Sequence, residues 1–198
     1  MLRTSALNIK PTSKEIIAGK GLQDTETVLI AGPFGAGKTT FIRTVSGKSI
    51  TTDRELSGIG VSAGEVKLKG STTVFADMGV AELDGRKLLL YGAPGQVRFS
   101  FTVKGLASRC KYLVFLVDTT DEAAVMRSRL YYERLIKPYF DRFTSKVFAL
   151  NKRDTSKLPI MRVLELFGSM NCPFVELVAL DKGSCLTALR ILLGGEGV

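Results

Sequence analysis

Residues 27–40 read TVLIAGPFGAGKTT, and this stretch governs how the rest of the chain is interpreted. Residues 27–31 are a short apolar run with β-branched side chains, which is typical of a buried strand. Residues 32–39 match the pattern GxxxxGK[ST]. Apolar residues then recur at helical spacing, and Gly47 is well placed to end a helix. The sequence therefore predicts a strand, a glycine-rich loop and a helix in direct succession.

The glycine-rich loop has the chemistry of a phosphate site. Glycines let backbone amides close around phosphate oxygens, and the start of the following helix adds free amides and a positive dipole. Lys38 is expected to reach the β- and γ-phosphates, and the Thr39 hydroxyl to bind Mg²⁺. The alternative, a surface turn with a solvated lysine, fits the position between strand and helix less well. The expected nucleotide-binding residues here are Phe34, Gly35, Ala36, Gly37, Lys38, Thr39 and Thr40.

A second polar motif, Asn151-Lys152-Arg153-Asp154, directly follows the strand expected at residues 146–150. Open α/β sheets bind ligands at the carboxyl ends of their parallel strands. The Asp154 carboxylate can accept hydrogen bonds from two adjacent donors, and guanine offers N1–H and N2–H₂ side by side. Adenine has no such pair and would leave the carboxylate desolvated and unpaired. We therefore expect Asp154 to select guanine, with the stem of Lys152 covering the face of the base.

The remaining apolar runs alternate with helical segments. Asp84-Gly85 predicts a hairpin between two of the strands. Continuous apolar strands separated by helices favour a mainly parallel sheet covered on both faces, with the hairpin adding one antiparallel edge strand. Glycine-rich residues 48–71 are expected to form a long connection with an extended piece at 65–69. Further strands are expected at 72–81, 87–91, 112–118, 146–150 and 174–178, and helices at 122–140, 160–169 and 184–193.

Composition narrows the classes of function. The 198-residue chain has the length of one domain, and its lack of histidine excludes histidine-based zinc sites, Ser-His-Asp triads and Cys-His dyads. The cysteines, Cys110, Cys172 and Cys185, are odd in number and lack CxxC spacing, so we expect free thiols in a reducing compartment. No apolar run approaches the roughly 20 residues of a membrane span, and neither a secretory signal nor a lipidation motif is visible. These features predict a cytoplasmic protein.

The net charge of +9 invites comparison with nucleic-acid-binding proteins. The positive excess lies mainly in residues 1–50 and 101–150, without a long Lys/Arg run. Aromatic and basic residues interleave between residues 131 and 143, but an amphipathic helix with its aromatics on the core side gives the same spacing. We therefore expect no nucleic-acid partner. An acidic protein or an anionic membrane surface fits the charge equally well.

Pro94-Gly95-Gln96, after the strand at 87–91, completes a series of motifs that resembles the Ras superfamily of small GTPases. The resemblance spans residues 27–193 and is closest to the prokaryotic MglA-type and Arf/Rab-like branch. It implies an α/β P-loop NTPase G domain at 27–198, after an N-terminal extension at 1–26. The implied architecture has three α/β/α layers around a mixed, mostly parallel six-stranded sheet.

The resemblance also implies a molecular switch in which GTP and Mg²⁺ order two loops and hydrolysis to GDP releases them. By position, Gln96 is the residue that orients the attacking water, and Lys38 and Thr73 complete the catalytic set. Thr73 fits the switch threonine best, with Thr51, Thr52 and Thr72 as alternatives. The family's remaining nucleotide contacts fall on Gly95, Asn151, Lys152, Asp154, Ala179 and Leu180.

Two departures from the family pattern bear on activity. Gly92 stands where most Ras-like proteins have the aspartate that holds Mg²⁺. MglA-type proteins also have a non-acidic residue at this position. Asp77 on the neighbouring strand is expected to replace the missing aspartate. The expected metal-binding residues are thus Thr39, Thr73 and Asp77. Phe34 stands where Ras has glycine and should crowd Gln96, so we expect slow hydrolysis, on the order of 10⁻⁴ s⁻¹ or below.

Several alternatives remain open. Arg54 or Arg98 would supply an arginine in cis, or both are solvated loop residues. Phe99 and Phe101 pack the second switch loop or offer an apolar patch to a partner. The resemblance implies a regulatory protein partner, with roadblock/longin-type activators as the family's example. The alternative is a scaffold that binds GTP or GDP without cycling, and a P-loop kinase or ATPase of another type is disfavoured by NKRD.

Overall fold

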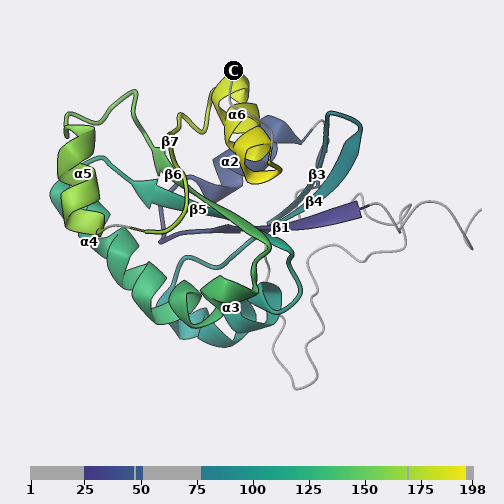
Figure 1. The fold of residues 1–198 in the computed structure, drawn as a ribbon, viewed down its shortest axis with the longest axis horizontal. Coiled ribbons are helices and arrows are strands. Elements are labelled where there is room, and N and C mark those ends of the chain that lie inside the picture. The colour runs from purple at the N-terminus through teal and green to yellow at the C-terminus, as the bar shows by residue number, and fades with distance from the viewer. Residues whose placement is uncertain (1–24, 47, 51–76, 169, 195–198) are drawn as a thin grey trace, which may run out of the picture.

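A computed structural model describes residues 25–46, 48–50, 77–168 and 170–194 of the chain. These residues form a seven-stranded sheet between two layers of helices (Figure 1). The strands are β1 (Thr25–Ala31), β2 (Lys48–Ile50), β3 (Met78–Leu83), β4 (Arg86–Gly92), β5 (Tyr112–Asp118), β6 (Ser145–Asn151) and β7 (Phe174–Glu176). The α-helices are α2 (Lys38–Val45), α3 (Ser100–Ala107), α4 (Glu122–Tyr131), α5 (Ile160–Phe167) and α6 (Lys182–Leu192). The predicted three-layer α/β class is therefore confirmed.

The sheet is mixed and mostly parallel. Its order is β2-β3-β4-β1-β5-β6-β7, with β4, β1, β5, β6 and β7 parallel and with antiparallel pairing of β2 to β3 and of β3 to β4. All six expected strands are present. The prediction of a single antiparallel edge strand was wrong, because β2 pairs beside β3 within the segment expected to be a connection. A three-residue strand is too short to show an alternating pattern in the sequence.

The predicted hairpin joins β3 to β4. Asp84 and Gly85 have φ values of 50° and 76°, and two left-handed residues are what a two-residue turn of this kind requires. β3 extends to Leu83, two residues beyond the expected end at 81, because the tight turn lets pairing continue up to it. Residues 72–76 of the expected strand lie outside the described residues, as does the extended piece expected at 65–69.

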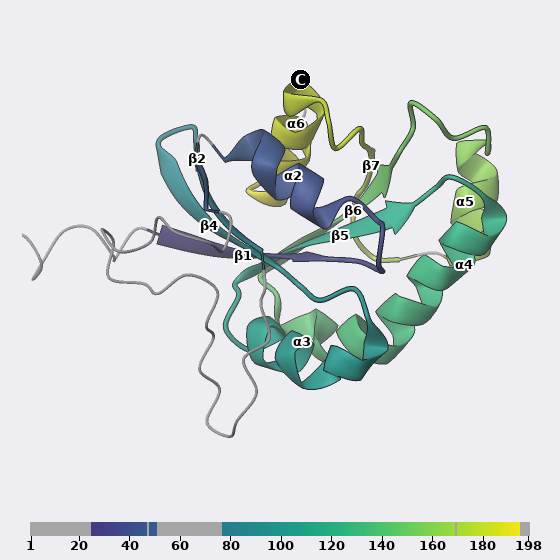
Figure 2. The ribbon, with the colours of Figure 1, turned by 180° about the vertical axis from the view of Figure 1, so that it is seen from behind.

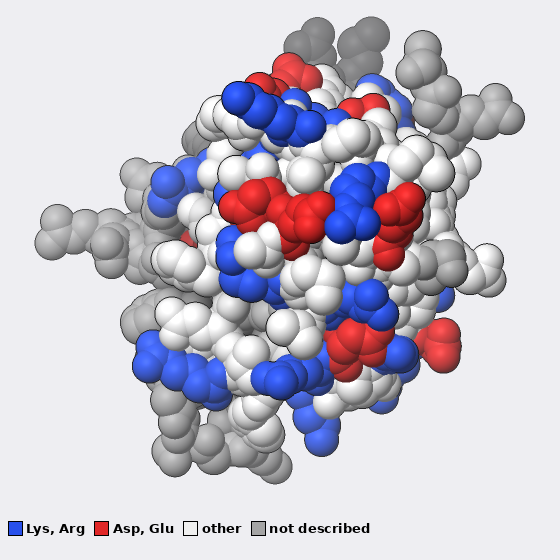
Figure 3. Space-filling model, turned by 90° about the vertical axis from the view of Figure 1, so that its left-hand side faces the viewer, with Lys and Arg blue, Asp and Glu red and all other residues white. Residues whose placement is uncertain are grey.

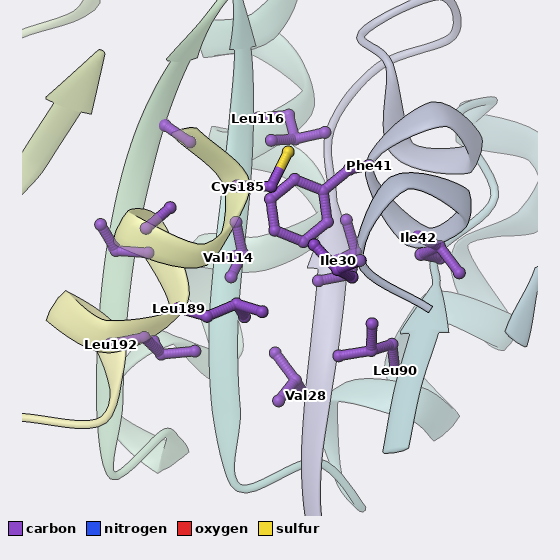
Figure 4. Packing of buried hydrophobic residues seen from close by; sticks show 14 of the residues in the cluster. Val28, Ile30, Phe41, Ile42, Leu90, Val114, Leu116, Cys185, Leu189 and Leu192 are labelled. Atoms are coloured by element: carbon purple, nitrogen blue, oxygen red, sulfur yellow. The ribbon is translucent and has the colours of Figure 1, made fainter. Parts of the chain in front are cut away.

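Each face of the sheet has its own apolar core. Helices α2 and α6 cover one face, and α3, α4 and α5 cover the other (Figure 2). On the first face, Phe41 of α2 points toward Cys185 of α6, with Ile30 of β1 and Leu116 of β5 beside them (Figure 4). β5 is buried along its whole length because it receives helices on both sides. The central strands therefore form a rigid support for the loops at their carboxyl ends.

The helix expected at 122–140 changes its winding along the way. Regular α4 ends at Tyr131, a π-helical turn spans Tyr132–Ile136, and a 3₁₀ segment spans Lys137–Arg142. Pro138 explains the second change, because proline lacks the amide that would continue the α-helical pattern. The prediction of one continuous helix was wrong, but its aromatics do lie toward the core, with Tyr131 and Tyr132 both buried.

Three smaller expectations can be compared with the described residues. β1 begins at Thr25, so the extension expected at 1–26 contributes its last two residues to the sheet. α2 ends at Val45, close to the expected stop at Gly47, which lies outside the described part. The three cysteines are free thiols as predicted, and burial raises the pKa of Cys110 and Cys185 to about 12 and that of Cys172 to about 11.

The charged side chains do not gather into one basic tract on the side where α4 and α5 lie. There, lysines and arginines alternate with a central group of acidic side chains (Figure 3). Arg162 of α5, for example, pairs with Glu122 of α4 and with Glu165. Among the helices that the structure describes, none has the length and apolarity needed to cross a membrane.

The aromatic cluster on the second face should make a large contribution to stability. Phe148 of β6 is fully buried and lies with ring centroids 5.1 to 5.4 Å from those of Phe115, Tyr132, Phe167 and Phe174. Phe148→Ala should lower the free energy of unfolding by about 3–5 kcal/mol, through lost burial and the cavity left behind. Phe101→Ala, at a site that is 61% exposed, is the matched control and should cost less than about 0.5 kcal/mol. Urea unfolding of the two variants measures both; equal losses would contradict the assignment.

Candidate nucleotide-binding site

The loop after β1, the start of α2 and the end of β4 enclose a cleft of about 410 Å³. Two groups of predicted site residues meet there: the phosphate-loop residues and the metal candidate Asp77. The loop after β4 joins them through Pro94 and Gly95, whereas Gln96 is exposed and is not among the lining residues. The lining consists of Phe34, Gly35, Gly37, Lys38, Thr39, Thr40, Asp77, Gly92, Ala93, Pro94 and Gly95.

Gly37 gives the loop its shape at the start of α2. It has φ of 96°, and a Cβ at this position would lie 2.4 Å from the side-chain nitrogen of Asn151. Any larger residue would therefore be strained in the backbone and would also displace Asn151. α2 begins at Lys38, and its first three residues line the cleft. The free amides and positive dipole of a helix N-terminus favour an anion.

Lys38 is folded back into the loop that it follows. Its ammonium donates to the carbonyl oxygens of Gly32 and Pro33, at 2.9 and 2.7 Å, and the residue is only 9% exposed. Burial lowers the pKa of Lys38 from 10.5 to about 8, and the nearby charge of Asp77 only partly offsets this effect. The lowered pKa shows that nearby negative charge does not fully compensate for the desolvation of this ammonium, so an anionic ligand in the cleft would stabilise its charged form.

Asp77 reaches the first turn of α2 from just before β3. The Thr39 hydroxyl donates to its Oδ2, and the amide of Gly92 donates to its carbonyl oxygen at 2.7 Å. A Cβ on Gly92 would lie 3.1 Å from the Cβ of Asp77 and 3.0 Å from Ile42. Position 92 thus has little room for a side chain while Asp77 is in place. The two positions together present one carboxylate beside the Thr39 hydroxyl.

Asn151 connects the phosphate loop to the rest of the site. This buried residue donates through Nδ2 to the carbonyl of Ala36 at 2.8 Å, and its Oδ1 accepts from the amide of Ala179 at 2.9 Å. The Thr44 hydroxyl of α2 donates to the carbonyl of Ala179 at 2.7 Å. These hydrogen bonds join the carboxyl end of β6, the loop after β7 and helix α2 with its preceding loop.

Asp118, at the end of β5, is a site residue that the sequence reasoning missed. It forms a 2.7 Å ion pair with the ammonium of Lys152, whose backbone is left-handed with φ of 69°. Burial alone would raise the pKa of Asp118, but hydrogen bonds from Lys152 and Thr120 outweigh it and hold the pKa below its usual value. The sequence did contain a signal for Asp118. It is an acidic residue at the end of an apolar strand, and that strand lies next to β6, which leads into the NKRD motif.

The remaining residues of the predicted base site lie around this pair. Asp154 is exposed in the turn after Lys152, Ala179 is buried, and Leu180 is 77% exposed. Arg153 supports the turn by pairing with Glu176 and donating to the carbonyl of Leu158. The residues predicted to contact the base are thus separate from those that line the cleft, and Asn151 lies between the two groups.

Phe34 lines the cleft as a phosphate-loop residue and is 80% exposed. The remaining predicted residues fall outside these two groups. Arg98 stacks over the ring of Phe99 at 4.7 Å, and Phe101 is exposed. The switch-threonine candidates Thr51, Thr52, Thr72 and Thr73 and the arginine candidate Arg54 lie outside the described residues.

Comparison with known proteins gives limited similarity. No model of a known protein family matches the chain. Over 83 residues, 42% of its length, the chain is 35% identical to a putative ABC transporter ATP-binding protein of Methanosarcina mazei, and it spans 13% of that protein. This similarity and the succession of β1, glycine-rich loop and α2 in a mostly parallel sheet are consistent with a P-loop NTPase-like fold.

Burial of Lys38 predicts a specific pH dependence of stability. Its pKa is about 8 in the folded chain against 10.5 ordinarily, so between these values the unfolded state binds more protons. The wild-type protein should therefore become more stable, relative to Lys38→Met, as the pH rises through this window, by up to about 3 kcal/mol.

Urea unfolding without nucleotide, near pH 7 and near pH 10, measures this difference. Lys104→Met removes an exposed lysine of α3 and should follow wild type at both pH values. A difference between wild type and Lys38→Met that does not change with pH would contradict the buried, charged state assigned to Lys38.

Proposed function

We propose that the protein is a guanine-nucleotide switch: it binds GTP with Mg²⁺, hydrolyses it slowly to GDP, and controls the binding of a regulatory protein partner. The contact that carries this proposal is the Asn151 bridge between Ala36 and Ala179. It joins a phosphate-type cleft to the NKRD loop, so one ligand with a phosphate chain and a base would span both. A small GTPase G domain has this division of tasks.

The choice of guanine rests on Asp154. Its carboxylate is exposed beyond the bridge and is free to accept from N1–H and N2–H₂ of a guanine ring, as argued from the sequence. The ammonium of Lys152 is held by Asp118 at 2.7 Å, and in this proposal its aliphatic stem covers the face of the base. ATP is the second candidate, because the similar Methanosarcina protein is described as ATP-binding.

Thr39 and Asp77 form the proposed metal site, with Thr73 as a further ligand. A hydroxyl and a carboxylate side by side are suitable oxygen donors for Mg²⁺. Thr39 and Asp77 would hold Mg²⁺, which would supply positive charge next to the phosphates. In this proposal Asp77 replaces the acid that position 92 lacks.

Slow hydrolysis follows from the loop after β4 and from Phe34. Gln96 is the proposed water-orienting residue, and Lys38 would stabilise charge on the phosphates. The amide of Phe34 donates to the carbonyl of Gly95 at 3.1 Å, so the backbone of Phe34 adjoins the loop that carries Gln96, while its ring is exposed and would have to turn inward to crowd Gln96. A partner protein of the roadblock/longin type would have to reorganise this region, and a non-cycling scaffold is the alternative.

A time course of bound nucleotide tests the proposal. Nucleotide-free protein is mixed with equal GTP and ATP plus Mg²⁺, and the bound nucleotides are quantified over hours. We expect GTP to bind preferentially and to decay to GDP at a rate on the order of 10⁻⁴ s⁻¹ or below. Asp154→Ala should lower the preference for GTP, whereas Asp141→Ala, an exposed acid in the 3₁₀ segment after α4, should not. Preferential binding of ATP would overturn the guanine assignment, and bound GTP that never decays would favour the scaffold.

If Asp77 helps to hold Mg²⁺, the substitution Asp77→Asn should reduce the extent to which Mg²⁺ slows the dissociation of nucleotide from the protein. The amide keeps the size of the carboxylate but removes its charge, so the ratio of nucleotide dissociation rates with EDTA and with Mg²⁺ should fall about tenfold or more. Glu82→Gln, on the exposed side of β3, is the control and should leave this ratio unchanged. An unchanged ratio in Asp77→Asn would show that Asp77 has no part in holding the metal.

A further inference from the structure

The three residues that precede Gln96 are each held by a different element of the fold. The amide of Ala93 donates to the carbonyl of Ile30 in β1 at 2.8 Å, and the carbonyl of Gly95 accepts from the amide of Phe34. Between them, the carbonyl of Pro94 accepts a 2.7 Å hydrogen bond from the hydroxyl of Tyr131 at the end of α4. Of these three bonds, the one from Tyr131 is made by a side chain.

Tyr131 is built into the helix layer. It is 3% exposed, and its ring lies 6.2 Å from that of Phe115 on β5. Burial raises the pKa of its hydroxyl above the usual value for tyrosine, so the hydroxyl keeps its proton and remains a donor. Pro94 lacks a backbone N–H donor, so its carbonyl oxygen is the backbone group through which the loop can form a hydrogen bond at this position.

The helix that carries Tyr131 is anchored at its N-terminus and again near Tyr131. The side chain of Asp121 caps α4 by accepting from the amide of Ala124, and Ser128 accepts from the amide of Asp118 at 3.0 Å. The helix leaves the α form immediately after Tyr131, where the π-helical turn begins. π turns are frequent at functional positions in helices. Tyr131 is thus the last regular residue of an anchored helix.

We propose that Tyr131 is a positioning residue that holds the loop carrying Gln96 against the cleft and thereby sets the rate of hydrolysis. The effect on the rate of hydrolysis rests on the proposed function, whereas the effect on the loop does not. Tyr131 is not among the residues that line the cleft, whereas Pro94 is, so in this proposal Tyr131 acts through Pro94 rather than on the nucleotide. Its loss should leave nucleotide affinity intact and reduce the time that Gln96 spends in a productive arrangement.

Tyr131→Phe is the test variant, because it keeps the buried ring and removes only the hydroxyl. Tyr112→Phe is the matched control: that buried hydroxyl accepts from Arg86 and belongs to the start of β5, whereas the cleft lies at the strands' other ends. Amide hydrogen exchange of residues 95–99, read by mass spectrometry in nucleotide-free protein, reports directly on the loop. Tyr131→Phe should exchange about threefold to tenfold faster there, as expected for one lost hydrogen bond, and Tyr112→Phe should match wild type.

The second readout separates rate from affinity. Single-turnover hydrolysis of GTP by Tyr131→Phe should be slower by about threefold to tenfold, with GDP affinity within about twofold of wild type. Unchanged exchange in the loop, unchanged hydrolysis, or a parallel fall in affinity and rate would each overturn the inference. If wild type itself hydrolyses no GTP, the proposed function fails, and the exchange measurement alone then decides whether Tyr131 holds the loop.

Discussion

The rest of the site depends on one buried side chain, the carboxamide of Asn151. It donates to the phosphate loop at Ala36 and accepts from Ala179 in the loop between β7 and α6. An amide suits this place because it offers a donor and an acceptor at once, and both backbone groups are thereby satisfied without any buried charge. Gly37 packs so closely against it that no larger residue fits. The spacing between the cleft and the NKRD loop therefore follows from a single residue.

The cleft combines a buried ammonium with a carboxylate and a hydroxyl. Lys38 is kept charged in a buried position, at a cost in stability that an anion would offset. Opposite it, Asp77 and Thr39 form an oxygen pair, made possible because Gly92 leaves space for the approach of Asp77. The buried ammonium lowers stability locally in the cleft, and the two apolar cores on either side of the sheet compensate for this cost.

Neighbouring elements also control the loop after β4. β1, α4 and the phosphate loop each hold one of its residues through hydrogen bonds to Ala93, Pro94 and Gly95. In the proposed switch, a ligand that altered the contact between Phe34 and Gly95 would also act on the hydrogen bond between Pro94 and Tyr131. The loop would then link the cleft to the helix layer.

The sequence by itself determined the class of fold and the positions of the two motifs that are proposed to bind the ligand. Its signals are local: residues 27–40 carry a strand, a loop and a helix within one short stretch, and Asp84-Gly85 specify a turn through their own backbone preferences. Only the tertiary structure decided the pairing of β2 with β3, the ion pair of Asp118 with Lys152, and the contact of Tyr131 with Pro94. Each of these joins residues that lie far apart in the chain. No periodicity or motif encodes such contacts, because they arise from how strands order themselves in the sheet and which helix packs over which loop.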